Sequence, residues 1–152
     1  MPARIVGSVY PIAAGDVFFS SPPVSAFAAA AINALPMWRK HITRQGLADL
    51  KARLHQGHSA FILFPEGSRS RTGEIQAFKA GVGMMVAGTP IPVVPCRLWG
   101  AFEALPPGGR LPRPRSLRAS FGTPLTFADQ PDNHDGWLAI TARLREAVLA
   151  IQ

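Results

Sequence analysis

A carboxylate, two serines and two arginines stand close together in the segment LFPEGSRSRTG, residues 63–73. Arginine guanidinium groups donate paired hydrogen bonds to phosphate oxygens, and the backbone amides around Gly67 can point at the same anion. The segment therefore predicts an anion site in which Arg69 and Arg71 bind phosphate. Glu66 cannot bind phosphate directly, so we expect it to orient an arginine, to hydrogen-bond a substrate hydroxyl or to hold the turn.

The anion segment follows a continuous apolar run, residues 60–64, which predicts a strand buried on both faces. Ligands of open α/β sheets bind at the carboxyl ends of such strands. The sequence predicts further strands at residues 5–13, 91–98 and 117–121, helices at 25–34, 45–55, 78–87 and 135–152, and a loop at 106–114. Because helices separate the strands, we expect one α/β domain over residues 1–152, with a mixed, partly parallel sheet flanked by helices. We expect residues 91–98 to form a second buried strand, although prolines 92 and 95 favour an edge or a bulge.

Basic residues outnumber acidic ones by 16 to 9, which gives a formal net charge of +7. Such a surface attracts anionic lipid headgroups, phosphorylated metabolites, an acidic carrier protein or nucleic acid. Binding to nucleic acid would rest only on the charge of residues 110–118, where no aromatic side chains are interleaved for stacking, so we expect no nucleic-acid partner. A single cysteine, Cys96, excludes an internal disulfide and a cysteine zinc site, and we expect it to be buried.

No segment reaches the roughly 18 to 20 uninterrupted apolar residues that a membrane-spanning helix needs. The longest apolar stretch, residues 24–35, ends at Pro36 and fits a core helix or one that lies in the membrane interface. The first eight residues lack the apolar region of a signal peptide. We therefore expect a cytoplasmic protein that attaches peripherally to the inner face of the membrane.

Three motifs follow one another along the chain: FPEGSRS at residues 64–70, FKAG at 78–81 and IPVVP at 91–95. In this order and spacing they resemble the third and fourth sequence blocks of the glycerophospholipid acyltransferases, the family of the 1-acyl-glycerol-3-phosphate acyltransferases. NALPMWR, residues 33–39, is similar to the second block, a hydrophobic run that ends in arginine. The resemblance covers residues 13–128 and implies a glycerol-3-phosphate acyltransferase-like fold.

The resemblance implies transfer of a fatty acyl group from acyl-CoA or acyl carrier protein to a hydroxyl of a lysophospholipid or glycerol phosphate, as in phospholipid biosynthesis. It implies that the acceptor is bound by Arg39, Glu66, Gly67, Ser68, Arg69 and Lys79. Among these, Arg39 and Arg69 are the implied phosphate ligands, and residues 93–95 are implied to lie near the acyl donor. The acyl thioester is a co-substrate, and we expect no cofactor and no metal.

In the family that these motifs resemble, the histidine of a His-x-x-x-x-Asp motif takes the proton of the acceptor hydroxyl. None of the four histidines here has aspartate at that spacing, because the residues five positions further on are Gly46, Ala60, Leu63 and Ala139. The resemblance places the motif upstream of residues 5–13, so we expect an N-terminally truncated domain without a catalytic residue. Alone it should transfer little or no acyl group, and a chain extended through that motif should be active. The alternative is a non-catalytic domain that binds anionic lipid or phosphate.

Overall fold

The computed structural model describes residues 9–14, 35–37, 44–55, 59–109 and 111–152. The chain divides into two compact units, Met1–Phe64 and Pro65–Gln152, and each is described by itself. The expectation of a single domain over residues 1–152 stays a prediction.

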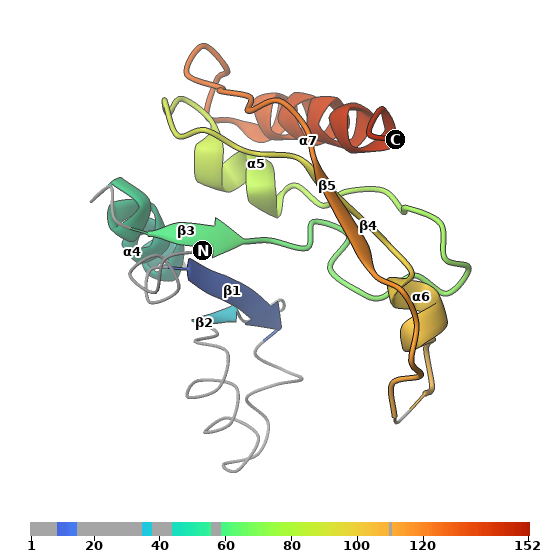
Figure 1. The fold of residues 1–152 in the computed structure, drawn as a ribbon. Coiled ribbons are helices and arrows are strands. Elements are labelled where there is room, and N and C mark those ends of the chain that lie inside the picture. The colour runs from blue at the N-terminus through green and yellow to red at the C-terminus, as the bar shows by residue number, and fades with distance from the viewer. Residues whose placement is uncertain (1–8, 15–34, 38–43, 56–58, 110) are drawn as a thin grey trace. The chain divides into compact units, whose positions relative to one another are not determined.

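The first unit contains a parallel sheet of three strands in the order β2-β1-β3 (Figure 1). Its elements are β1 (Val9–Ala14), β2 (Leu35–Met37), α4 (Arg44–His55) and β3 (Ala60–Ile62). The central strand β1 pairs with both neighbours, with Ile12 opposite Leu35 and Val9 opposite Ala60. Both pairs are parallel, and parallel neighbours require crossover connections. This sheet is therefore the parallel part of the predicted architecture.

Most predicted elements of the first unit that fall on described residues are confirmed. Helix α4 matches the predicted helix 45–55, and β1 overlaps the predicted strand 5–13 over residues 9–13. The predicted helix 25–34 lies outside the described residues, and the short strand β2 was not predicted.

The expected burial of strand 60–64 on both faces is wrong. Strand β3 ends at Ile62, which is 44% exposed, and Phe64 beyond it is 63% exposed. Within the described sheet β3 has only β1 as a neighbour, so it is an edge strand of three residues. An apolar run supplies side chains that favour burial, but burial also needs elements that cover both faces.

The second unit contains two helices that pack on each other and an antiparallel strand pair (Figure 1). Its elements are α5 (Gly81–Val86), β4 (Cys96–Trp99), α6 (Ala101–Ala104), β5 (Arg118–Phe121) and α7 (His134–Leu149). In the strand pair Cys96 lies opposite Phe121 and Trp99 lies opposite Arg118. Parallel and antiparallel pairs therefore both occur in the chain, which confirms the predicted α/β class, but the described strands form two separate sheets and not one mixed sheet.

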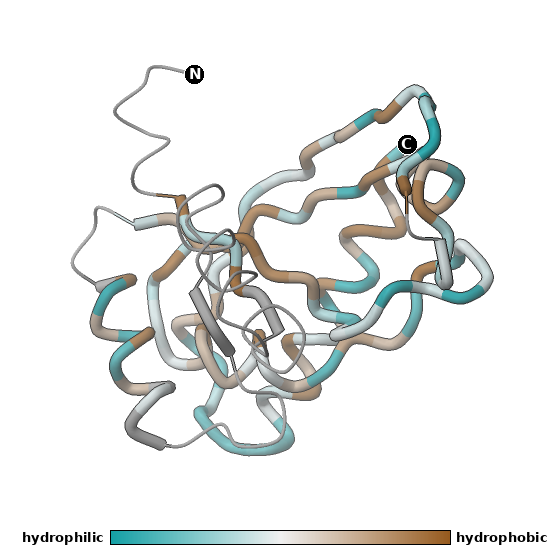
Figure 2. Tube along the Cα trace, turned by 90° about the horizontal axis from the view of Figure 1, so that it is seen from below, coloured by the Kyte–Doolittle hydropathy of each residue, from teal (hydrophilic) through white to brown (hydrophobic). Residues whose placement is uncertain are grey.

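The core of the second unit lies between α5 and α7. Its buried apolar side chains are Val82, Met85 and Val86 of α5, Ile140 and Leu144 of α7, and Phe127. Gly83 allows the two helix backbones to touch, because a Cβ at this position would lie 2.5 Å from the carbonyl oxygen of Trp137. Apolar and polar residues alternate along the chain, as the brown and teal segments of Figure 2 show. The sequence places apolar residues along one stripe of the last helix, at Trp137, Ile140, Leu144, Val148 and Ile151, and of these Ile140 and Leu144 are buried in this core.

Hydrogen bonds hold both ends of α7, which begins one residue before the predicted helix 135–152 and ends three residues earlier, at Leu149. Asn133 caps the helix, since its side-chain oxygen accepts a hydrogen bond of 2.9 Å from the backbone N–H of Gly136. At the other end Arg97 of β4 donates to the carbonyl oxygens of Leu149, at 3.2 Å, and Ile151, at 2.9 Å. Helix α7 is therefore fixed at both ends and along its buried side.

Strand 91–98 was expected to be buried and is not. Strand β4 begins only at Cys96, and Val94 and Leu98 are 48% and 53% exposed. Among the described strands β4 pairs with β5 alone, so it is an edge strand, as the prolines indicated. Cys96 is exposed, and the expectation that it is buried is wrong, because it shares a face with Phe121, which is itself 71% exposed.

The remaining predictions for the second unit differ in detail from the structure. The predicted helix 78–87 is shortened to α5, and the predicted strand 117–121 is confirmed as β5. The described residues of the predicted loop 106–114 contain no helix or strand. The short helix α6 was not predicted.

Candidate anion-binding site

The loop of residues 66–76, which we call the anion loop, is closed by its own side chains. A carboxylate oxygen of Glu66 accepts a hydrogen bond of 2.9 Å from the backbone N–H of Gln76, so the first and last residues of the loop are joined. The hydroxyl oxygen of Ser70 accepts a 3.0 Å bond from the backbone N–H of Gly73. Of the three roles expected for Glu66, holding the turn is therefore the one that the structure shows.

A residue from the last helix fixes the same end of the anion loop. The Nε of Arg145 donates to the carbonyl oxygen of Gln76 at 3.1 Å, and its Nη2 donates to the carbonyl oxygen of Ile75 at 3.3 Å. Sequence reasoning missed Arg145, because it stands 69 positions after Gln76 and no local motif marks it.

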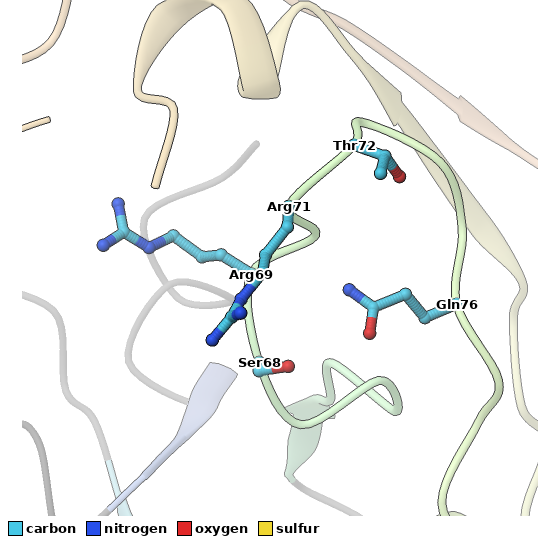
Figure 3. A pocket seen from close by; sticks show the side chains of 5 residues that line it. All are labelled: Ser68, Arg69, Arg71, Thr72 and Gln76. Carbon is cyan, nitrogen blue, oxygen red and sulfur yellow. The ribbon is translucent and has the colours of Figure 1, made fainter. Parts of the chain in front are cut away.

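A hollow of about 290 Å³ lies within the anion loop (Figure 3). It is lined by Ser68, Arg69, Arg71, Thr72 and Gln76. Figure 3 shows the amide of Gln76 pointing toward Ser68 and Arg71 from the opposite side of the loop. Both arginines are exposed, and within the described part of the chain neither guanidinium has a hydrogen bond or ion pair. Their donors are therefore open to an external anion such as phosphate.

Lys79 brings a further positive charge to the start of the anion loop. The backbone N–H of Lys79 donates to the carbonyl oxygen of Pro65 at 2.8 Å. Its side chain lies over Gly67, since a Cβ on that glycine would be 2.8 Å from the ammonium nitrogen. Gly67 has φ +72, a left-handed conformation that glycine adopts without strain.

The structure brings together five of the six residues expected to bind the acceptor. Ser68 and Arg69 line the hollow, whereas Glu66, Gly67 and Lys79 form its supporting turn. Arg39, the sixth, lies outside the described residues. Arg71, which the sequence predicts as a phosphate ligand, also lines the hollow, and so do Thr72 and Gln76, which were not predicted. The place of Thr72 and Gln76 within the same closed loop is the signal that could have found them.

The described residues show no metal-binding cluster of three or more His, Cys, Asp or Glu side chains. His134 has an acidic neighbour, since its Nδ1 lies 3.9 Å from a carboxylate oxygen of Asp135. Both side chains are almost fully in solvent, at 72% and 99% exposed. This adjacent pair differs from the buried and oriented His–Asp pair that general-base catalysis uses.

The fold and the anion loop define an α/β protein with an exposed hollow that two arginines line. The model of the acyltransferase family matches residues 3–99, which is more than half of the chain. The chain therefore belongs to the acyltransferase family.

Curated relatives agree with this assignment over shorter stretches. The chain is 43% identical over 53 residues to a chloroplastic 1-acyl-sn-glycerol-3-phosphate acyltransferase of Brassica napus, covering 35% of this chain and 15% of the relative. It is 33% identical over 70 residues to a 1-acyl-sn-glycerol-3-phosphate acyltransferase of Cocos nucifera, covering 46% of this chain and 23% of the relative. The matched regions thus span less than a quarter of these relatives.

A solved structure has a similar fold. The crystal structure of the 1-acyl-sn-glycerophosphate acyltransferase from Thermotoga maritima matches with a TM-score of 0.67 and 22% sequence identity. The match covers 93% of this chain and 54% of that one, so this chain spans about half of its length. The similarity confirms the expected fold class.

Proposed function

We propose that this chain contributes acceptor binding to transfer of a fatty acyl group from acyl-CoA or acyl carrier protein to a hydroxyl of a lysophospholipid or glycerol phosphate. The observation that carries the proposal is that Arg69 and Arg71 line the hollow of the anion loop, and that neither guanidinium has a hydrogen bond or ion pair within the described residues. Membership of the acyltransferase family and the names of the relatives give the reaction class.

The chemistry assigns a limited task to the anion loop. The acceptor hydroxyl oxygen attacks the thioester carbonyl carbon, a C–O bond forms, the C–S bond breaks, and the thiolate leaves. A base takes the hydroxyl proton, and the thiolate is protonated in turn. Binding the acceptor phosphate at Arg69 and Arg71 would hold the nearby hydroxyl in a fixed place for this attack.

Proton removal requires a group other than those in the anion loop. Glu66 uses one carboxylate oxygen to hold Gln76, which suits an anchor better than a base. Arginine and serine are poor bases at neutral pH. No histidine of residues 1–152 has the His-x-x-x-x-Asp spacing. The exposed arginines that line the hollow also fit a second candidate function, a non-catalytic domain that binds phosphate or anionic lipid at the same loop.

Peripheral attachment to the anionic inner face of a membrane is also part of the proposal. The described residues include no helix that is both long and apolar enough to cross a bilayer. The net charge of +7 and the exposure of every residue from 111 to 119, three arginines among them, support electrostatic attachment.

Titration and turnover measurements on residues 1–152 test the proposal together. We expect lysophosphatidate and sn-glycerol 3-phosphate to bind, and acyl transfer from acyl-CoA to stay far below an ordinary enzymatic rate of about 1 per second. Failure of both acceptors to bind would remove the anion loop as the acceptor site. Turnover at an ordinary rate would instead show that a base lies within these residues and would exclude the non-catalytic alternative.

A further inference from the structure

We propose that Arg145 of α7 is a positioning residue for the anion loop. Its guanidinium spans two successive carbonyl groups at the end of the loop and thereby fixes the place of Gln76 in the hollow. This inference rests on the proposed function for the identity of the anion, but the contacts that carry it belong to the structure.

The peptide groups around Gln76 are held from two directions. The N–H of Gln76 donates to Glu66 at 2.9 Å, while its carbonyl oxygen accepts from Arg145 Nε at 3.1 Å. The carbonyl oxygen of Ile75 accepts from Arg145 Nη2 at 3.3 Å. No helix or strand includes residues 63–80, so side chains replace the backbone ladder that would otherwise order this segment.

Helix α7, which carries Arg145, is held in place by core packing and by hydrogen bonds at its end. The neighbouring side chain, Leu144, is buried in the core against α5, and Ile140 one turn earlier is buried as well. The carbonyl oxygens at the end of α7 accept hydrogen bonds from Arg97. Because Arg145 projects from a fixed helix, its hydrogen bonds hold the loop in one place. The loop then loses less conformational entropy when the anion binds.

Arg145 differs from Arg69 and Arg71 in what its donors do. Its Nε and Nη2 are engaged by backbone carbonyl oxygens, whereas no bond within the described residues occupies the donors of the other two. We therefore assign Arg145 to the support of the site and not to direct contact with the anion. A lysine at this position would keep the charge but lose the rigid fork that bridges two carbonyl groups.

The matched variants are Arg145→Gln, Arg145→Lys and Arg143→Gln. Arg143 stands on the same helix, and its guanidinium lies 5.7 Å from the centre of the Phe127 ring, so this control removes an equal charge without touching the loop. Calorimetric titration with sn-glycerol 3-phosphate should show about tenfold weaker binding for both Arg145 variants and less than a twofold change for the control.

Amide hydrogen exchange separates positioning from general stability. In both Arg145 variants the Gln76 amide should exchange faster while the amides of α5 keep their protection. Affinity of Arg145→Lys equal to that of the unchanged protein would overturn the proposal, because charge alone would then suffice. Equal loss of protection in α5 would also overturn it, since Arg145 would be a stability element. If the unchanged protein binds no sn-glycerol 3-phosphate, the proposed function fails, and the Gln76 exchange rates still decide whether Arg145 fixes the loop.

Discussion

Two loops of the second unit carry arginines, and they differ in how they are held. The anion loop contains Arg69 and Arg71, and the loop of residues 105–117, here called the basic loop, contains Arg113 and Arg115 among its described residues. Side chains of Glu66, Ser70 and Arg145 bind the backbone of the anion loop. In the described part of the basic loop the hydrogen bonds are between backbone groups, such as that from Arg113 N–H to the Ala104 carbonyl oxygen at 2.7 Å. The two loops therefore carry similar charge, but only the anion loop is preorganised by side-chain hydrogen bonds. A site that binds one anion in a fixed place requires such preorganisation.

The largest expected difference between the two loops concerns Arg69 and Arg113. Arg69→Ala should weaken binding of lysophosphatidate or sn-glycerol 3-phosphate by roughly 1.5 to 3 kcal/mol, the value of a hydrogen bond to a charged group. Arg113→Ala should leave the affinity nearly unchanged, because its loop has no side-chain frame. Calorimetric titration of both variants measures the difference. Equal affinities would exclude Arg69 from the site and would show that the two loops do not differ in anion binding.

One glycine in each loop tests the same difference between the anion loop and the basic loop. Gly67 and Gly108 both have positive φ, +72 and +85, so Gly67→Ala and Gly108→Ala should each lower the free energy of unfolding by about 1 to 2 kcal/mol. Only Gly67→Ala should also change the affinity for sn-glycerol 3-phosphate, since the new Cβ would displace the Lys79 side chain. At Gly108 the space around a Cβ is open. Denaturant unfolding and titration give the two quantities, and an unchanged affinity for Gly67→Ala would show that Lys79 does not contribute.

The basic loop should matter more for a surface than for a single small anion. Arg115→Gln is expected to weaken binding to vesicles of anionic lipid by about 1 kcal/mol, the usual contribution of one basic residue near a membrane surface. Co-sedimentation at increasing salt measures this effect, which should fade as screening grows. Neutral vesicles are the control. Equal binding to neutral and anionic vesicles, independent of salt, would contradict electrostatic attachment.

The smallest expected effect tests the internal hydrogen bonds of the anion loop. Ser70→Ala removes the acceptor of the Gly73 N–H and, because this hydrogen bond is exposed to solvent, should lower the free energy of unfolding by only about 0.5 kcal/mol. Ser116→Ala in the basic loop is the matched control, because its hydroxyl has no hydrogen bond within the described residues. Thermal unfolding followed for both variants would reveal a difference. Identical midpoints would mean that the Ser70 bond contributes nothing to stability.

Local features of the sequence predicted much of the fold. Helical spacing located α4 and α7, and the clustered arginines and serines of the anion loop pointed to the place where the structure has a hollow. Each of these signals lies within one stretch of chain, where side-chain period and residue type are sufficient.

Features that depend on distant partners could not be predicted in the same way. The engagement of Arg145 with Ile75 and Gln76 joins positions about 70 residues apart. The exposure of Phe64 and Cys96 depends on what covers the strands, which an apolar run does not specify. The role of Glu66 needed the position of Gln76, because a carboxylate suits several tasks equally well.

The close approach of α5 and α7 at Gly83 makes the anion loop sensitive to a single methyl group. A Cβ at Gly83 would lie 2.5 Å from the Trp137 carbonyl oxygen, so α7 would have to move outward to admit it. Arg145 travels with that helix, and its bonds of 3.1 and 3.3 Å are already near the long end of the hydrogen-bond range. The distance between the two helices therefore determines how closely Arg145 can approach the loop. Gly83 sets that distance, although it is not part of the hollow.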